Sequence, residues 1–246
     1  MKEYSFKEHF LELKKRILII TIFFFVAFAL SYFFKEEFFS LSLKPLIESF
    51  SNHDRKMIYT GLTEAFFSYI KLSLFSAFCL TLPMICYQCY AFIAPGLHSH
   101  ERKIVLSVLL LSPLLFYTGS FFLFYVVMPK AWEFFLSYEN NDTALPLVLE
   151  GRISEYLSLV IQLMMSFGLA FQLPIIMVIL CILGVISSDS LQRKRRIAVV
   201  IIFIASAIFT PPDIISQIAL AIPLLLLYEL SIVWCKFLKT KDKTRC

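Results

Sequence analysis

The feature that most restricts the fold of this chain is a set of long apolar runs without a charged residue. Four such runs extend over residues 17–34, 72–92, 104–128 and 156–186. An α-helix needs about 20 apolar residues to cross the hydrocarbon core of a bilayer, and only helices or closed barrels satisfy their backbone there. The runs show no alternation of polar and apolar residues, so they predict helices rather than barrel strands.

The composition supports insertion in a membrane. Hydrophobic residues make up 59% of the 246 residues and charged residues only 17%, too few to cover a water-soluble surface. The first run follows a mixed-charge stretch and lacks a small-residue cleavage site after it, so we expect it to remain as a span. Five of the six cysteines lie in apolar runs, and we expect them to pack as thiols rather than form disulfides.

The last apolar stretch, 197–235, is interrupted by Thr210-Pro211-Pro212-Asp213. Two prolines remove backbone donors and push the preceding residue out of helical geometry, which predicts two helices. The first rises only about 20 Å, less than the hydrocarbon thickness of roughly 30 Å. A re-entrant hairpin is an alternative that leaves the tail on the same side. The predicted spans are 17–34, 68–92, 104–128, 156–186, 197–209 and 214–235, followed by a tail over 236–246.

Basic residues predict the orientation. They dominate the N-terminus, the loop containing Arg102, the loop over 193–196 and the tail. The segments predicted on the opposite side of the membrane contain fewer basic residues, together with several acids. Prolines within the runs predict kinks, and the outer segments 35–65 and 129–155 predict short amphipathic helices on the membrane surface. We therefore expect an all-α integral membrane protein of one domain, a bent bundle of six transmembrane helices with both termini in the cytoplasm and two short final spans.

Motifs for enzymatic or metal chemistry are weak in this sequence. His98 and His100 lie two residues apart in GLHSHERK, but no His-Glu-x-x-His or paired-cysteine motif accompanies them. Nucleophile elbows, phosphate-binding glycine loops and dinucleotide fingerprints do not occur either. We expect no metal, no cofactor, no nucleic-acid ligand and no enzymatic activity.

Two acids stand among bases at the predicted cytoplasmic membrane surface. Glu101 precedes Arg102 and Lys103, and Glu12 precedes Lys14, Lys15 and Arg16. Each acid could simply be solvated and paired with its neighbours, a contribution of about 0–1 kcal/mol. Alternatively, the two carboxylates receive a basic ligand, and bidentate pairing would favour arginine over lysine.

Polar residues inside the predicted spans are few: Gln162, Gln172, Gln217 and Glu229. A charge at the bilayer centre costs about 2.5–3.5 kcal/mol on insertion scales, so Glu229 should face protein or water. It could also be an ordinary acid near the cytoplasmic end of the last span. Both interpretations of Glu229 are compatible with the sequence.

Three stretches resemble one known family. HFLELKKRIL, YQCYAFIAPGLHSHERK and FTPPDIISQIALAIPLLLLYE, in this order, are similar to the TatC family of the twin-arginine (Sec-independent) protein translocase. The resemblance covers nearly the whole chain and implies six spans in a bacterial inner membrane. It implies a receptor for signal peptides with two consecutive arginines, which recruits single-span partners of the TatA and TatB types, associates with itself, and supports export of folded proteins driven by the proton-motive force.

The resemblance also implies roles for individual residues. For signal-peptide binding these are Glu12, Glu101, Phe92, Leu97, Lys14, Arg16 and Arg102. Pro45, Pro95 and Asp213 are further implied positions, to which we add Glu229. Contact with partner helices is expected at Thr210, Gln217 and Gln172.

Two positions differ from the family pattern. The family often has arginine where Lys14 stands, and many members have an intramembrane glutamate where this chain has Gln172. Glutamine forms hydrogen bonds but does not titrate, so we assign Gln172 to a polar contact with a partner helix or to water. A small-solute transporter using Glu229, Gln172 and Gln162 is the alternative function, and an intramembrane enzyme is a third hypothesis without a catalytic motif.

Overall fold

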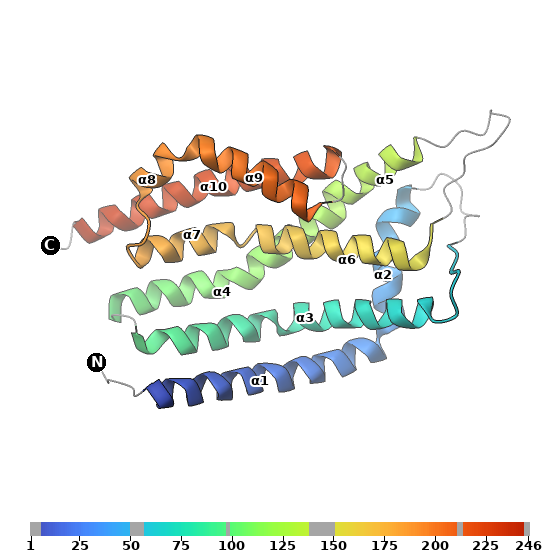
Figure 1. Ribbon diagram of the computed structural model, residues 1–246, viewed down its shortest axis with the longest axis horizontal. Helices are drawn as coiled ribbons and strands as arrows, with labels where there is room; N and C mark the ends of the chain where they lie inside the picture. The colour runs from blue at the N-terminus through green and yellow to red at the C-terminus, as the bar shows by residue number, and fades with distance from the viewer. Residues whose placement is uncertain (1–5, 50–56, 97–98, 138–150, 211–213, 244–246) are drawn as a thin grey trace.

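The computed structural model describes residues 6–49, 57–96, 99–137, 151–210 and 214–243, which form helices joined by short connections (Figure 1). The helices are α1 (Phe6–Phe33), α2 (Lys35–Ser49), α3 (Glu64–Ile93), the 3₁₀ turn η1 (Ala94–Gly96), α4 (Ser99–Phe122), the π-helical segment η2 (Leu123–Val127), α5 (Met128–Leu136), α6 (Ile153–Ala170), α7 (Leu173–Ile182), α8 (Ser188–Arg193), α9 (Arg195–Phe209) and α10 (Ile214–Lys243).

The long helices pack side by side. α1 packs mainly on α3, α3 also contacts α4 and α6, and α10 contacts α7 and α9. α1 begins and α10 ends at the same end of the bundle, where α3 also ends and α4 begins (Figure 1). We call this the basic end, because it contains Lys14, Lys15, Arg16, Arg102, Arg193, Lys194, Arg195, Arg196 and Lys236.

Five helices in the described part of the chain are long and apolar enough to cross a membrane. They cover His9–Phe33, Glu64–Gly96, Val105–Leu136, Ile153–Ile182 and Ser216–Phe237, and each overlaps a predicted span. The remaining predicted span corresponds to α9, which has 15 residues and is short, as its sequence predicts. The count of six spans and the cytoplasmic position of the termini stay predictions.

Two helix boundaries differ from the sequence prediction. The predicted span 156–186 is two helices, because α6 ends at Ala170 and α7 begins at Leu173, with Pro174 in its first turn. Gln172 N donates to Leu169 O in a tight turn at this break. α10 continues to Lys243, so most of the predicted tail 236–246 extends the last helix.

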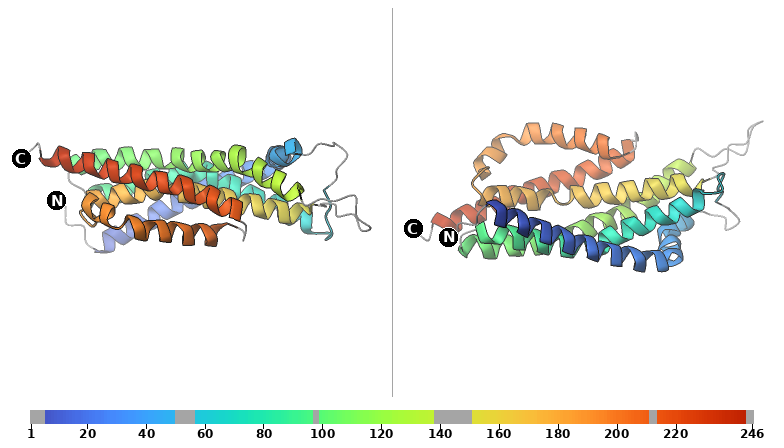
Figure 2. Two further views of the ribbon diagram at one scale, coloured as in Figure 1. Left: turned by 90° about the horizontal axis from the view of Figure 1, so that it is seen from above. Right: turned by 60° about the horizontal axis from the view of Figure 1, so that its bottom comes forward.

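A short helix, α2, is present in the first outer segment, at the end opposite the basic end, as expected. α2 lies across the ends of the long helices (Figures 1 and 2), and Tyr156 of α6 donates from its hydroxyl to the Ser42 carbonyl at 2.6 Å. Pro45 and Leu46 of α2 are buried. In the second outer segment the described residues do not form a separate surface helix, because α5 continues η2 without a gap and ends the long apolar stretch Val105–Leu136. Residues 138–150 lie outside the described residues. Buried contacts therefore attach α2 to the bundle.

The buried core lies around α4, η2, α6 and α10 rather than at α1. Phe116, Phe167, Leu157 and Leu220 are fully buried. Along α1, by contrast, most large hydrophobic side chains are exposed: Ile17, Leu18, Ile22, Phe23, Phe25, Val26, Leu30 and Phe33. Apolar side chains exposed in this way suit contact with lipid.

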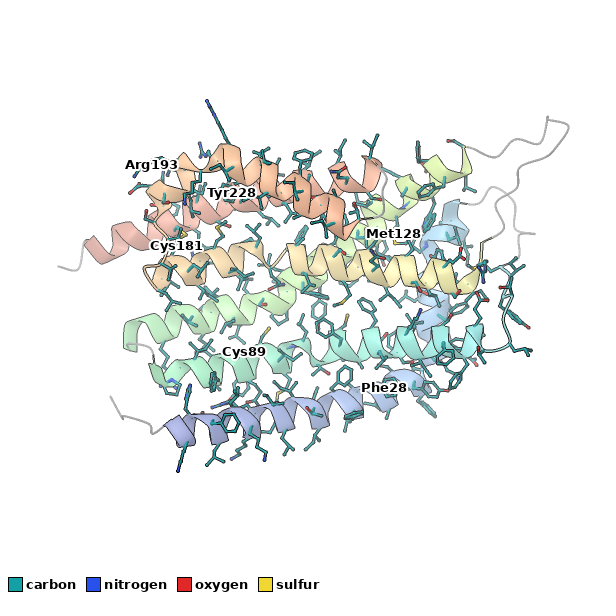
Figure 3. All side chains as sticks on the ribbon, in the orientation of Figure 1. Phe28, Cys89, Met128, Cys181, Arg193 and Tyr228 are labelled. Carbon is teal, nitrogen blue, oxygen red and sulfur yellow. A yellow bond between two sulfur atoms is a disulfide. The ribbon has the colours of Figure 1, made fainter. Side chains whose placement is uncertain are left out.

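One cysteine pair corrects the expectation that the cysteines pack as thiols. Cys181 of α7 and Cys235 of α10 form a disulfide, with their Cα atoms 6.1 Å apart. Figure 3 shows Cys181 beside the path of α10. The expectation was wrong for this pair because 54 residues separate the cysteines in sequence, and only the packing of α7 on α10 brings them together.

Glu64 holds together the end opposite the basic end. Its Oε1 accepts from Ser154 Oγ at 2.7 Å, and its Oε2 accepts from the backbone N–H groups of Thr60 and Gly61 at 2.8 and 3.1 Å. The backbone pair Ile58–Arg152 lies beside it. One carboxylate therefore connects the turn before α3, α3 itself and the start of α6.

We expect Glu64→Gln to lower the apparent unfolding temperature of the detergent-purified chain by several degrees. An amide offers one acceptor oxygen instead of two, so its NH₂ group would face an N–H or O–H donor. The matched control is Glu155→Gln, because Glu155 is exposed and pairs with Arg152 alone among the described residues. Equal unfolding temperatures for the two variants would contradict this role of Glu64.

Candidate functional site

Glu12 of α1, one of the two acids predicted at the membrane surface, lies at the basic end. It forms an ion pair with Arg16, one helical turn later. Arg16 Nε donates to Glu12 Oε1 at 3.1 Å, and Nη2 donates to the same oxygen. The side chains are 20% and 27% exposed, so the pair is partly screened from water. Glu12 is therefore held by its own helix in a fixed position.

Arg16 also reaches the neighbouring helix α3. Its Nη1 donates to Gln88 Oε1 at 3.0 Å, and its Nη2 donates to the Ala91 carbonyl at 2.9 Å. A guanidinium presents donors in a planar fork, which a lysine ammonium cannot reproduce. Arg16 thus fixes the position of Glu12 relative to α3, a role that differs from direct ligand binding.

The second carboxylate oxygen of Glu12 is available. Among the residues that the structure describes, Glu12 Oε2 accepts no hydrogen bond, because both donors from Arg16 meet Oε1. An ionised carboxylate can accept at both oxygens and can receive a guanidinium. Glu12 can therefore bind a second cation without losing Arg16.

Phe92 of α3 contacts α1 through the ring of His9. The rings of His9 and Phe92 stack with centroids 4.4 Å apart and an interplanar angle of 26°. His9 lies one turn before Glu12 on α1 and is exposed, whereas Phe92 is half-buried. The end of α3 and the start of α1 therefore form one surface with an aromatic edge and an acid.

The start of α4 adjoins this surface. Arg102 Nε donates to the Tyr90 hydroxyl at 3.1 Å, which connects the first turn of α4 to the last turn of α3. Pro95 is exposed in the 3₁₀ turn between the two helices. Glu101 belongs to the same first turn of α4, but its side chain and the whole of Leu97 lie outside the described residues. Lys14 is exposed on α1.

Three contributors were missed by the sequence analysis: His9, Gln88 and Tyr90. Gln88 and Tyr90 both stand in the stretch YQCYAFIAPGL, which carried part of the family resemblance. The one available signal was a glutamine inside an apolar run, since a buried amide needs a partner. Nothing in the sequence pairs it with Arg16, 72 residues earlier.

Comparison with known proteins gives a family. Residues 8–223 match the family model described as Sec-independent protein translocase protein (TatC). The chain belongs to the TatC family. It is 56% identical over 240 residues to the Sec-independent protein translocase protein TatC of Rickettsia prowazekii (strain Madrid E), covering 98% of this chain and 96% of the relative.

More distant relatives and a solved structure agree. The TatC protein of Escherichia coli (strain K12) is 37% identical over 237 residues, covering 96% of this chain and 90% of the relative. A crystal structure of a twin arginine translocase receptor, TatC, superimposes with a TM-score of 0.77 at 36% identity, covering 92% of this chain and 98% of that one. Members of the TatC family are components of a protein translocase, so this chain functions in protein transport across a membrane.

In this TatC-family chain, two of the residues expected to contact partner helices lie between α9 and α10. Thr210 is buried at the end of α9 and donates to the Ser206 carbonyl at 2.8 Å. Gln217 Nε2 donates to the Phe203 carbonyl at 3.3 Å across the two helices. The connecting Asp213 lies outside the described residues. Gln217 thus helps to hold the short helix α9 against α10, whereas Thr210 satisfies a carbonyl of the last turn of α9.

Gln172 has its partners within the chain. Ser112 of α4 donates from Oγ to Gln172 Oε1, and Gln172 Nε2 donates to the Ser112 carbonyl at 3.0 Å. Both ends of the amide are used, and they connect the α6–α7 break to α4. A partner helix would form hydrogen bonds with the Gln172 amide only by replacing its hydrogen bonds to Ser112.

Glu229 pairs at the basic end. Its Oε2 is 2.7 Å from Arg195 Nη2 of α9, and both side chains are about half exposed. An exposed pair of this kind contributes about 0–1 kcal/mol. The pair favours the interpretation of Glu229 as an acid near a membrane surface, with Arg195 neutralising its charge.

Proposed function

We propose that this TatC-family chain is the receptor subunit that binds twin-arginine signal peptides at the basic end, in the cytoplasm. The observation that supports this proposal is the geometry of Glu12, whose Oε1 is held by Arg16 while Oε2 is available. In the proposed complex, one arginine of the signal meets Glu12 and the other meets Glu101. In this proposal Lys14 and Arg102 also contact the signal peptide, as does Leu97, which lies outside the described residues.

The arginine pair and the apolar segment of a signal peptide contribute differently. Guanidinium pairs with partly hydrated carboxylates supply only about 1 kcal/mol each. Transfer of an apolar segment from water contributes about 25 cal/mol per Å², which is roughly 10 kcal/mol for 400 Å². We infer that the arginines determine specificity, whereas the apolar segment, lying against the spans, supplies most of the affinity.

We further propose that single-span subunits of the TatA and TatB types dock at α9 and α10, and that the receptor associates with itself. Support comes from the apolar surface of these helices, on which Ile201, Ile204 and Ile208 of α9 and Ile218 of α10 are exposed. α9 is shorter than the bilayer, so the membrane around it would thin. Export of folded cargo then uses the proton-motive force.

The small-solute transporter alternative receives no support from the geometry. Gln172 is bonded to Ser112, Glu229 is bonded to Arg195, and Gln162 is exposed on α6. These three residues do not converge on a common polar path. They therefore do not provide the coordinated site that solute transport requires.

Photo-crosslinking to two signal peptides tests the proposed receptor. A probe next to the arginine pair should label the natural chain, in membranes with its partner subunits, several-fold more than the same signal carrying two lysines. Glu12→Gln should reduce this arginine-to-lysine ratio, because the neutral amide loses the charge-assisted bond. Glu36→Gln, an exposed acid on α2, should leave the ratio unchanged. An unaltered ratio in Glu12→Gln would refute the role of Glu12.

A further inference from the structure

An apolar groove of about 560 Å³ opens between α10, η2 and the α6–α7 break. Its lining includes Phe122, Phe171, Ile222 and Leu226, and its charged member is Lys130 of α5. Figure 2, seen from above, shows α10 running beside the segment α4–α5. The groove is remote from the Glu12 site at the basic end.

Irregular backbone in three helical segments lines this groove. η2 is π-helical, so each of its turns holds one additional residue, and such segments concentrate at functional sites. α6 and α7 are separated at Phe171 and Gln172. In α10, Pro223 lacks the N–H that would bond to the Ala219 carbonyl, and both residues line the groove.

The size of the groove favours a single acyl chain. A helix about 10 Å across and 12 residues long occupies roughly 1,400 Å³, more than twice the groove volume. Small-molecule sites have about 300–1,000 Å³. From Ala219 to Leu230 the groove follows α10 for about 17 Å at 1.5 Å per residue, close to the roughly 15 Å depth of one leaflet.

The charge of the groove favours an anionic headgroup. Lys130 is exposed, and it makes no ion pair with any residue that the structure describes, Glu133 one turn later included. It belongs to α5, and both α5 and the start of α10, which carries Ala219, lie toward the end of the bundle opposite the basic end (Figure 1). A lysine ammonium binds phosphate as a point charge. A lipid phosphate at Lys130 would place its acyl chain along α10 toward Leu230.

We propose that this groove binds one anionic phospholipid, with the phosphate on Lys130 and one acyl chain between α10, η2 and the α6–α7 break. The bound lipid fills the space beside the π-helical segment, the α6–α7 break and Pro223. It thereby supports the packing of α10 on the rest of the bundle. The site is specific for a negative headgroup because Lys130 is the charged residue of its lining.

Photolabelling of the full chain in phosphatidylcholine nanodiscs tests this site. The probe is a minor fraction of phosphatidylglycerol with a diazirine on its acyl chain, compared with phosphatidylcholine carrying the same group. We expect phosphatidylglycerol to label Phe122, Ile222 and Leu226 several-fold more strongly. Equal labelling by the two lipids, or labelling spread evenly over the exposed faces of α1 and α9, would overturn the proposal.

Two variants with matched controls sharpen the test. Lys130→Gln should lower phosphatidylglycerol labelling about fivefold, the factor that one lysine contributes near an anionic surface, whereas Lys44→Gln, an exposed lysine of α2, should not. Ala219→Phe should block the groove, unlike Ala207→Phe on the exposed face of α9. Equal phosphatidylglycerol labelling of Lys130→Gln and Lys44→Gln would show that Lys130 does not hold the phosphate and would overturn the proposal. Displacement of the lipid by an added single-span partner that crosslinks to Leu226 would overturn it as well.

Discussion

Glu101→Lys is expected to abolish crosslinking of a twin-arginine signal peptide and export of its folded cargo. The substitution places a cation where the proposed receptor receives a guanidinium, in the first turn of α4 beside Arg102. Repulsion then replaces attraction, and like-charge contacts at an interface cost several kcal/mol. Crosslinking in membranes that contain the partner subunits, together with export of a folded reporter, measures both effects.

The matched control for Glu101→Lys is Glu48→Lys, which reverses an exposed acid of α2 at the other end of the bundle. It changes the net charge equally and should retain crosslinking and export. The amount of each variant in the membrane, measured by immunoblot, separates lost binding from lost protein. Normal crosslinking by a well-expressed Glu101→Lys chain would rule out Glu101 as a receptor residue.

Gly119→Ala is expected to have the largest effect on stability. A Cβ at Gly119 of α4 would lie 2.7 Å from the Phe167 carbonyl oxygen and 2.8 Å from Phe171 Cγ. The carbonyl belongs to the backbone of α6, so the two helices would have to separate. Overpacking of this kind costs about 1–3 kcal/mol. Thermal unfolding of the detergent-purified chain should show a lower midpoint and, in cells, a smaller amount of folded protein.

Gly96→Ala provides the control for Gly119→Ala, because a Cβ there meets nothing within 4 Å. Its unfolding midpoint should equal that of the natural chain. Gly168, whose added Cβ would collide with the Phe116 ring, should behave like Gly119. Similar midpoints for Gly119→Ala and Gly96→Ala would show that α4 and α6 are not as closely packed as the structure describes.

The local features of this chain follow from its sequence. The apolar runs predicted the positions of the five long helices. Each segment in hydrocarbon must by itself avoid charged residues and unpaired backbone groups, so the segment's own sequence is sufficient for this prediction. The short helix α9 before Pro211 likewise follows from proline chemistry. The sequence also placed two acids at one membrane surface, and the structure describes the contacts of one of them, Glu12.

The break between α6 and α7 shows where this local reasoning stops. The run 156–186 is apolar throughout, and Pro174 within it predicted only a kink. At the turn over Phe171 and Gln172, Ser112 of α4 bonds to both ends of the Gln172 amide, 60 residues away in sequence. A half-buried amide stabilises such a break when a second helix presents the complementary groups.

The sequence by itself thus determined which segments are helices, that the paired prolines end α9, and which acids lie at the basic end. The tertiary structure decided which residues meet. It joined Cys181 to Cys235 and directed Arg16 to Gln88, and it left Glu12 Oε2 without a hydrogen bond from any described residue. It also brought η2, the α6–α7 break and Pro223 to one groove beside Lys130. Hydropathy and proline geometry act within a segment, whereas these contacts depend on the packing of side chains that are far apart in the chain.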